Sequence, residues 1–160
     1  MKNLEDLFEN QLKDLYSAET QIIDALPKMA EAASDSKLQQ AFKAHLEETK
    51  IHKKRLEEVC DELSIKPTGE DCKGMRGLIK QAQSMMKEDS EQAVKDAGLI
   101  AEAQRVEHYE ISGYGTAVRY AKELGHKDIA KKLQKTLDEE HKTDQKLTKM
   151  AESRLNKKAV

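Results

Sequence analysis

Apolar residues recur every three or four positions over long stretches of this chain, and this spacing predicts amphipathic α-helices. The first stretch indicates one helix over roughly residues 3 to 32, marked by Leu4, Phe8, Leu12, Leu15, Ile22, Ile23, Leu26 and Met29. The Ser-Asp-Ser run at 34–36 then offers turn and N-cap side chains. A second helix is therefore expected near residues 36 to 64, with an apolar face made of Leu38, Phe42, Leu46, Leu56, Val59 and Leu63.

The second half of the chain repeats this organisation after a long connection. Residues 65 to 77 hold Pro67 and three glycines, and they lead into a short helix expected over residues 78 to 87. A third long helix carries apolar residues from Val94 to Leu124 and is expected to end at Gly125, a C-cap glycine. A fourth starts near Ile129, and residues 156–160 are expected to fray. Two helical hairpins joined by a long crossover predict an all-α four-helix bundle, a single domain over residues 1–155.

The two hairpins also resemble each other at a shift of 91 residues, which suggests a duplicated unit. The matched positions include both apolar and acidic residues. They are Glu19 with Glu110, Met29 with Tyr120, Leu38 with Ile129, Phe42 with Leu133, Leu46 with Leu137, Glu48 with Glu139, and Leu56 with Leu147.

Composition and charge narrow the class of protein. The 28 basic and 30 acidic residues nearly cancel and are interspersed, which argues against a nucleic-acid partner. No run approaches about 20 apolar residues, and the start lacks the apolar core of a secretory signal. We therefore expect a cytoplasmic protein with no membrane partner. Cys60 and Cys72 are too few for a disulfide scaffold and are expected to be reduced thiols, a bridge between them being the alternative.

Acidic residues interrupt the core-facing stripe of each expected long helix near its middle. Glu19, for example, lies between Leu15 and Ile22, so its carboxylate is expected to point inward. The full set comprises Glu19 in the first helix, Glu48 in the second, Glu107 and Glu110 in the third, and Glu140 and Asp144 in the fourth.

Burying even one unpaired carboxylate costs several kcal/mol, and a group of them requires positive charge or raised pKa values. Arg55 is the best-placed side chain for this task, and Arg105 is less well placed. Two metal ions would balance the six acids better, and oxygen-rich ligation favours hard or borderline ions. We therefore predict a dinuclear carboxylate site with iron favoured over manganese and no organic cofactor.

The histidines and tyrosines near these acids have weaker signals. His52 follows Glu48 by one turn and is included as a ligand, whereas His45 is expected behind the ligands; His45 and Glu139 remain alternatives to the ligands named. The remaining histidines, His108, His126 and His141, are expected on the surface. Tyr16 and Tyr114 are expected in the core, with a hydrogen bond to a ligand or a redox role as the alternative.

The distribution of acids over four helices resembles the ferritin-like superfamily, and the pair Glu107 and Glu110 resembles rubrerythrins. The segments LYSAETQ, AHLEET, AQRVEHYEISGYGT and LDEEHKTDQKL are similar to the YciF/YciE-like family (DUF892) of small bacterial ferritin-like proteins, over essentially the whole chain. This resemblance implies a compact bundle, a homodimer, a dinuclear metal centre and an association with bacterial stress responses. The apolar residues Leu78, Ile79, Met85 and Met86 are candidates for the dimer surface.

Carried over by position, the resemblance and the acidic stripes give one expected metal-ligand set: Glu19, Glu48, His52, Glu107, Glu110, Glu140 and Asp144. The superfamily's Glu-x-x-His element is missing, because Ile51 and Thr143 stand three residues after Glu48 and Glu140. At most one histidine ligand is therefore expected. A rubredoxin-type Cys-x-x-Cys pair is also missing. Two functions remain open: a di-iron protein that oxidises ferrous iron with peroxide or oxygen, and a non-enzymatic helical interaction protein with a weak or vestigial metal site. No catalytic residue is assigned.

Overall fold

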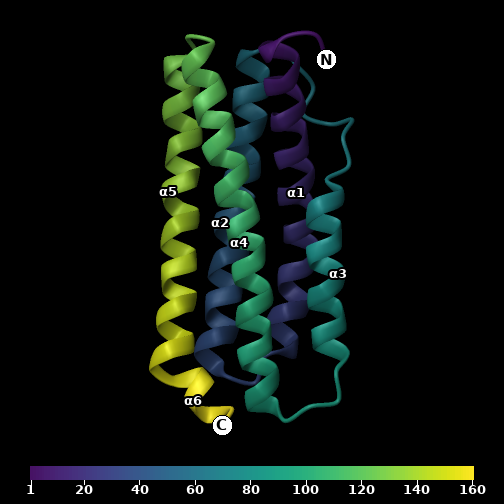
Figure 1. Ribbon diagram of the computed structural model, residues 1–160, viewed down its shortest axis with the longest axis vertical. Coiled ribbons are helices and arrows are strands. Elements are labelled where there is room, and N and C mark those ends of the chain that lie inside the picture. Colours follow the sequence, from purple (N-terminus) through teal and green to yellow (C-terminus); the bar gives the residue numbers. More distant parts are fainter.

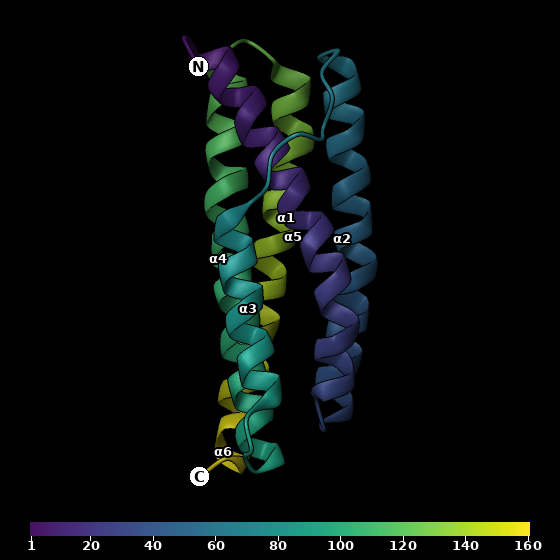
Figure 2. The same cartoon turned by 90° about the vertical axis from the view of Figure 1, so that its right-hand side faces the viewer.

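The computed structural model describes residues 1–160 and contains helices and no strands. Four long helices lie side by side along the long axis of the molecule (Figure 1). They are α1 (Leu4–Ala32), α2 (Ser36–Glu62), α4 (Gln92–Glu123) and α5 (Lys127–Met150). The shorter α3 (Lys73–Lys87) packs along the outside of the bundle against α1 and α4 (Figure 2). The predicted all-α bundle with a helical crossover is confirmed.

Local capping groups explain where the long helices begin and end. The Asn3 side chain accepts a hydrogen bond from the Asp6 backbone N–H at 2.8 Å, which caps α1. Asp35 caps α2 in the same way, by accepting from the N–H groups of Lys37 and Leu38. At the end of α4, Gly125 adopts a φ of +80°, the left-handed conformation expected of a C-cap glycine.

Helix α3 begins at Lys73, whereas the sequence predicted a start near residue 78. Gly74 and Gly77, taken as loop residues, are helical. Gly74 is needed for close packing, because a Cβ atom there would lie 2.5 Å from the Tyr109 ring on α4. Tertiary contact thus overrides the weak helix propensity of glycine.

The apolar residues of α3 cover the bundle. Leu78, Ile79 and Met86 pack on buried core residues, and Met85 lies against Gly98 of α4. These residues, candidates for a dimer surface in the sequence, are therefore half-buried within the chain itself.

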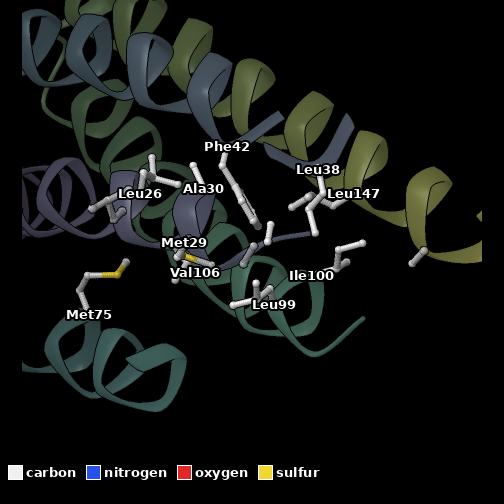
Figure 3. Close-up of a cluster of buried hydrophobic side chains, with 14 of the residues drawn as sticks. Leu26, Met29, Ala30, Leu38, Phe42, Met75, Leu99, Ile100, Val106 and Leu147 are labelled. Atoms are coloured by element: carbon white, nitrogen blue, oxygen red, sulfur yellow. The ribbon is translucent and has the colours of Figure 1, made fainter. Parts of the chain in front are cut away.

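The bundle has two separate apolar clusters. One joins the C-terminal half of α1 to α2, α3, α4 and the π-helix η1 (Ala151–Leu155); Figure 3 shows Leu26, Met29 and Phe42 within it. The other lies toward the opposite end and includes Leu12, Leu56 and Leu133. Because apolar burial on both sides supplies the main stabilising free energy, the layer between the clusters is free to hold polar groups.

The remaining features agree with a compact helical chain. Cys60 and Cys72 are both buried and free, so the disulfide alternative is not formed. None of the helices has the length and apolarity needed to cross a membrane. After α5 the chain continues as a π-helix, η1 (Ala151–Leu155), and a last helical turn, α6 (Asn156–Lys158). Fraying of residues 156–160 in solution stays a prediction.

Candidate metal centre

Four of the predicted acids meet in the layer between the two apolar clusters. Glu19 comes from α1, Glu107 and Glu110 from α4, and Glu140 from α5, and each side chain is exposed by no more than 1%. The apolar stripe of each helix faces the bundle axis, so an acid within that stripe is carried inward with it. The sequence predicts that acids from all four long helices meet; those from α1, α4 and α5 do, whereas Glu48 of α2 is half-buried, and the metal-ligand set stays a prediction.

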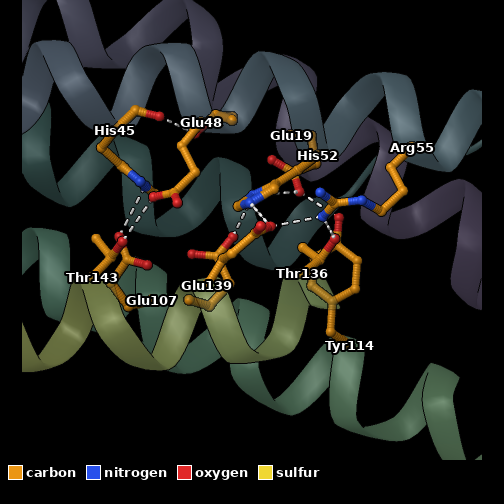
Figure 4. Close-up of polar contacts among 12 residues, drawn as sticks. Glu19, His45, Glu48, His52, Arg55, Glu107, Tyr114, Thr136, Glu139 and Thr143 are labelled. Atoms are coloured by element: carbon orange, nitrogen blue, oxygen red, sulfur yellow. Dashed lines mark hydrogen bonds and ion pairs between the residues drawn. The ribbon is translucent and has the colours of Figure 1, made fainter. Parts of the chain in front are cut away.

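Helix α2 contributes two histidines to the same layer (Figure 4). His45 Nε2 lies 3.0 Å from Glu107 Oε1, and the His45 side chain is 6% exposed. His52 is fully buried, and its Nδ1 lies 2.8 Å from Glu140 Oε1 and 3.7 Å from Glu19 Oε1. The layer therefore contains two imidazoles, whereas the sequence analysis expected at most one and placed His45 behind the ligands. Their seven-residue spacing, close to two helical turns, is the signal that could have paired them.

The ligand atoms fall into two groups that share one residue. His45, Glu107, Glu110 and Glu140 form the first group, and Glu19, His52 and Glu140 form the second; within each, the candidate ligand atoms lie within 4.8 Å of one another. Glu140 belongs to both. Each group could hold a metal ion, and the shared Glu140 carboxylate makes the two groups neighbours.

A third group lies nearer the surface. It comprises Glu48, His52 and Glu139, of which the two glutamates are half-buried. The Glu48 carboxylate accepts a hydrogen bond from the Thr143 hydroxyl at 3.2 Å. His52 Nε2 lies 3.1 Å from Glu139 Oε2, so this imidazole contacts the inner layer through one nitrogen and the outer group through the other.

Asp144 is not brought to any of these groups. Its carboxylate accepts a hydrogen bond from Gln104 at 3.0 Å and lies 3.3 Å from Nε2 of the exposed His108. Four residues beyond Glu140 correspond to a rise of about 6 Å along the helix and a further rotation, which takes this side chain out of the layer. Any ligand role for Asp144 or Glu48 stays a prediction; Glu48 and Glu139 belong to the same outer group, and His45 belongs to the inner layer.

The cation Arg55 does not reach the buried acids. Its Nη1 donates to Glu139 Oε2 at 2.7 Å and also to the Thr136 hydroxyl. Burial alone would raise the pKa of Glu139, but the hydrogen bond and charge of Arg55 lower it below its usual range. Arg55 therefore neutralises the outer group, and the inner layer contains no lysine or arginine.

Protonation can compensate the negative charge of the inner layer when no cation is bound. Burial raises the pKa of Glu19 and of Glu107 to about 8, and raises that of Glu110 well above its usual value. Burial would lower the pKa of His45, but the neighbouring Glu107 raises it to about 10. The buried Tyr114 hydroxyl also donates a hydrogen bond to Glu19. The sequence predicts that either raised pKa values or metal ions compensate the buried acids, and it favours metal ions. The geometry of the layer is compatible with protonation and with metal binding.

One further observation indicates that these ligand atoms could bind a metal ion. Several buried ligand atoms form no hydrogen bond, among them both oxygens of Glu110 and of Glu140, although Glu140 Oε1 lies in an ion pair with His52 and His45 Nε2 lies in one with Glu107. Buried polar atoms without partners are rare in folded proteins. Glu110 is the clearest case, since neither oxygen takes part in a hydrogen bond or ion pair. A mixed carboxylate and imidazole set suits iron, manganese or zinc, and it lacks the thiolates that select softer ions.

The sequence shift of 91 residues is reflected in this geometry. Glu19 and Glu110 are both fully buried, and Glu48 and Glu139 are both half-buried members of the outer group. Origin by duplication stays a hypothesis.

Comparisons with known proteins agree with the fold. Residues 3–160 match the family model described as domain of unknown function DUF892. Protein YciF of Escherichia coli strain K12 is 48% identical over 160 residues, which cover 99% of this chain and 96% of that protein. The crystal structure of the E. coli stress protein YciF matches with a TM-score of 0.94 at 47% identity, and covers 98% of this chain and 99% of that one.

Two further structures are similar. YcfI from Rhodopseudomonas palustris matches with a TM-score of 0.90 at 44% identity over 92% of this chain and 94% of that one. A protein from Xanthomonas campestris pv. campestris, at 18% identity and a TM-score of 0.77, covers 94% of this chain and 93% of that one and shows the shared fold alone. The full-length family match and the high identity lead to one conclusion: this chain belongs to the DUF892 family.

Proposed function

We propose that this protein binds two metal ions in its buried carboxylate layer and oxidises ferrous iron with peroxide or oxygen during bacterial stress. The observation that carries the proposal is Glu110, a fully buried carboxylate with no protein partner for either oxygen. Leaving it so is costly unless a cation or a proton compensates the charge. The stress role rests on similarity to a relative described as a stress protein.

Each residue of the layer has a role in this proposal. Glu140 belongs to both ligand groups, so it is suited to bridge two ions. Tyr114 orients Glu19 through its hydroxyl, and His52 is held between Glu140 and Glu139. The apolar clusters on either side limit water to the polar layer. These residues would hold two ferrous ions, which would each give up one electron, and the two electrons with two protons would reduce one hydrogen peroxide to two water molecules.

Iron is favoured over manganese by the mixed oxygen and nitrogen donors. The proposal also retains the cytoplasmic location, where thiols such as Cys60 and Cys72 stay reduced. The homodimer stays part of the proposal too, and sedimentation of the purified chain tests it.

The test is anaerobic titration with ferrous iron. We expect two equivalents per chain for the natural sequence, followed by ferric absorbance and oxidant consumption when peroxide or oxygen is added. Glu110→Gln preserves the shape of the side chain and should reduce binding below two equivalents, whereas the exposed Glu123→Gln on the same helix should not. Failure of the natural protein to bind iron, manganese or zinc would contradict the proposal.

One observation favours a second candidate, a non-enzymatic interaction protein with a vestigial site. The raised pKa values of Glu19 and Glu107 show that protons alone can balance part of the layer. In that case Glu110→Ala should stabilise the chain by removing a buried acid and should leave unfolding insensitive to added metal. If metal binding is the function, the same substitution should remove the stabilisation that metal gives to the natural protein.

A further inference from the structure

A pocket of about 280 Å³ opens at the surface between α2 and α5 and extends to α4, at the edge of the candidate metal centre. Its inner end is formed by His45, Glu107 and Thr143, which are buried. Its mouth is formed by exposed residues, among them Lys37 and Lys146. The pocket is therefore a passage from solvent to the polar layer.

The wall between these two ends is apolar. Phe42, Ala103 and Leu147 are buried there, and the small side chains of Ala41 and Ala44 leave the passage open. The carboxylate and imidazole groups of the lining are those of Glu107 and His45, which are buried, and of Glu48, which is half-buried. A pocket with apolar walls and a few polar groups at one end is typical of small-molecule sites, and this volume lies at the lower limit of their usual range.

The charges are arranged in a fixed order along the passage. The lysines that form ion pairs are Lys13, Lys50, Lys131, Lys132 and Lys158, so the two at the mouth have no acidic partner. Of the two acids, Glu107 is buried beside His45, and the half-buried Glu48 accepts a hydrogen bond from Thr143. An anion is therefore attracted at the mouth and repelled at the inner end of the metal-free protein.

We propose that this pocket binds a small amphipathic organic anion, a medium-chain carboxylate, with its head group between Lys37 and Lys146 and its hydrocarbon chain along Phe42 and Leu147. The lysines disfavour a metal cation at the mouth, and an uncharged hydrocarbon would leave them unused. This binding does not require metal.

The test uses the full-length protein after chelation, with octanoate as the probe and two-dimensional amide NMR as the readout. We expect saturable shifts at pocket residues such as Ala44, Ala103 and Leu147. Reversal of both mouth charges, Lys37→Glu with Lys146→Glu, should raise the octanoate Kd by about tenfold or more, since two favourable pairs become unfavourable. Ala44→Trp at the exposed mouth should block binding and leave the rest of the spectrum unchanged.

The matched control reverses Lys43 and Lys142, exposed residues on the same two helices that do not line the pocket. Its Kd should stay within about twofold of the natural value. Octanol, which lacks the charge, should bind more weakly than octanoate. The inference is overturned if octanoate does not bind saturably, if the shifts lie elsewhere, or if both double variants bind equally well.

Binding of ferrous iron is measured on the same preparations, so the pocket proposal and the metal proposal can be contradicted independently. Two bound equivalents of iron without octanoate binding would defeat only the pocket assignment. If reversal of the two mouth lysines weakens octanoate binding but the protein takes up no metal, the pocket proposal is supported and the metal proposal is contradicted.

Discussion

The buried acids of the polar layer differ in the hydrogen bonds that they accept. Glu19 and Glu110 correspond across the two hairpins and are equally buried, yet only Glu19 has a hydrogen-bond donor, the Tyr114 hydroxyl. Glu110 depends on a cation or a proton for compensation. This asymmetry means that substitutions around the two acids should have different effects on stability and on metal binding.

Removal of the Tyr114 hydroxyl should destabilise the metal-free protein without lowering metal stoichiometry. Tyr114→Phe takes away a buried donor and leaves one more oxygen of Glu19 without a partner, which costs about 1–3 kcal/mol. Urea denaturation after chelation measures this. Tyr16→Phe is the matched control, because Tyr16 donates to Glu57 from a half-buried position and its loss should have a smaller effect. Equal losses for the two variants would contradict the assignment.

At the scale of elements, close approach between helices explains features that propensity alone does not. Helix α3 contains Gly74 and Gly77 within its first turns, but only Gly74 faces a neighbour. The Tyr109 ring opposite it is held by hydrogen bonds of its hydroxyl with Asp14, at 3.1 Å, and with Cys72, at 3.0 Å. The ring is therefore not free to swing away from an added methyl group.

Alanine at these two glycines should change stability in opposite directions. Gly74→Ala pushes α3 away from Tyr109 and should destabilise the protein by about 1–3 kcal/mol. Gly77→Ala meets nothing within 4 Å and should stabilise it by about 0.5–1 kcal/mol through helix propensity. Thermal and urea unfolding of both variants provide the measurement. Stabilisation by Gly74→Ala would show that α3 has room to shift.

Asp35 joins two distant elements, and its loss should affect both. It caps α2 through the N–H groups of Lys37 and Leu38 and also forms an ion pair with Arg154 of η1. Asp35→Ala should cost about 1–2 kcal/mol from the cap alone. Asp35→Asn keeps a capping oxygen and loses the charge, so it should cost less, and unfolding measurements on both variants separate the two contributions.

The ion pair also gives Asp35 a defined pH dependence. The hydrogen bond from Arg154 lowers the pKa of Asp35 below its unfolded value of about 3.9, so its contribution is present above that pH and is lost as the pH falls further. Acid unfolding of the natural protein should therefore steepen below about pH 4, and Asp35→Asn should flatten this part of the curve. An identical acid limb in both proteins would contradict the assignment.

At the scale of the whole molecule, a charged layer lies between two apolar clusters that fold the chain around it. Burial raises the pKa of Glu19 and Glu107 to about 8, and neighbouring acids raise that of His45 to about 10. The metal-free native state therefore binds more protons than the unfolded chain from about pH 4.3 upward. Since stability falls with pH wherever the native state binds more protons, raising the pH should weaken the metal-free fold.

Chelated and metal-loaded protein should respond oppositely to pH. After chelation, the free energy of unfolding should fall steadily between about pH 5 and pH 9, as the buried groups lose protons. Stabilisation by added Mn²⁺ should grow over the same range, because metal binding displaces those protons. Urea denaturation with and without Mn²⁺ at three pH values measures both trends. A chelated protein whose stability rises with pH would show that the layer is already ionised and compensated.

The four long helices and the acids in their apolar stripes follow from the sequence alone, because apolar spacing and capping residues act within a few turns. Helix bounds set by Asn3, Asp35 and Gly125 agree with the structure to within a residue or two. Glu19, Glu107, Glu110 and Glu140 were identified as inward-facing for the same reason, since each lies in an apolar stripe. The local chain fixes the direction of a side chain relative to its own helix.

Which of these side chains meet depends on how the helices pack against one another. The rotation and axial position of each helix depend on packing against the other three, and a difference of one turn moves a side chain by about 5 Å. This excludes Asp144 from the layer, brings in His45, and directs Arg55 to Glu139. It also extends α3 through Gly74, where contact with Tyr109 outweighs local propensity. The pocket between α2 and α5 has the same origin, because its lining residues come from three helices, α2, α4 and α5.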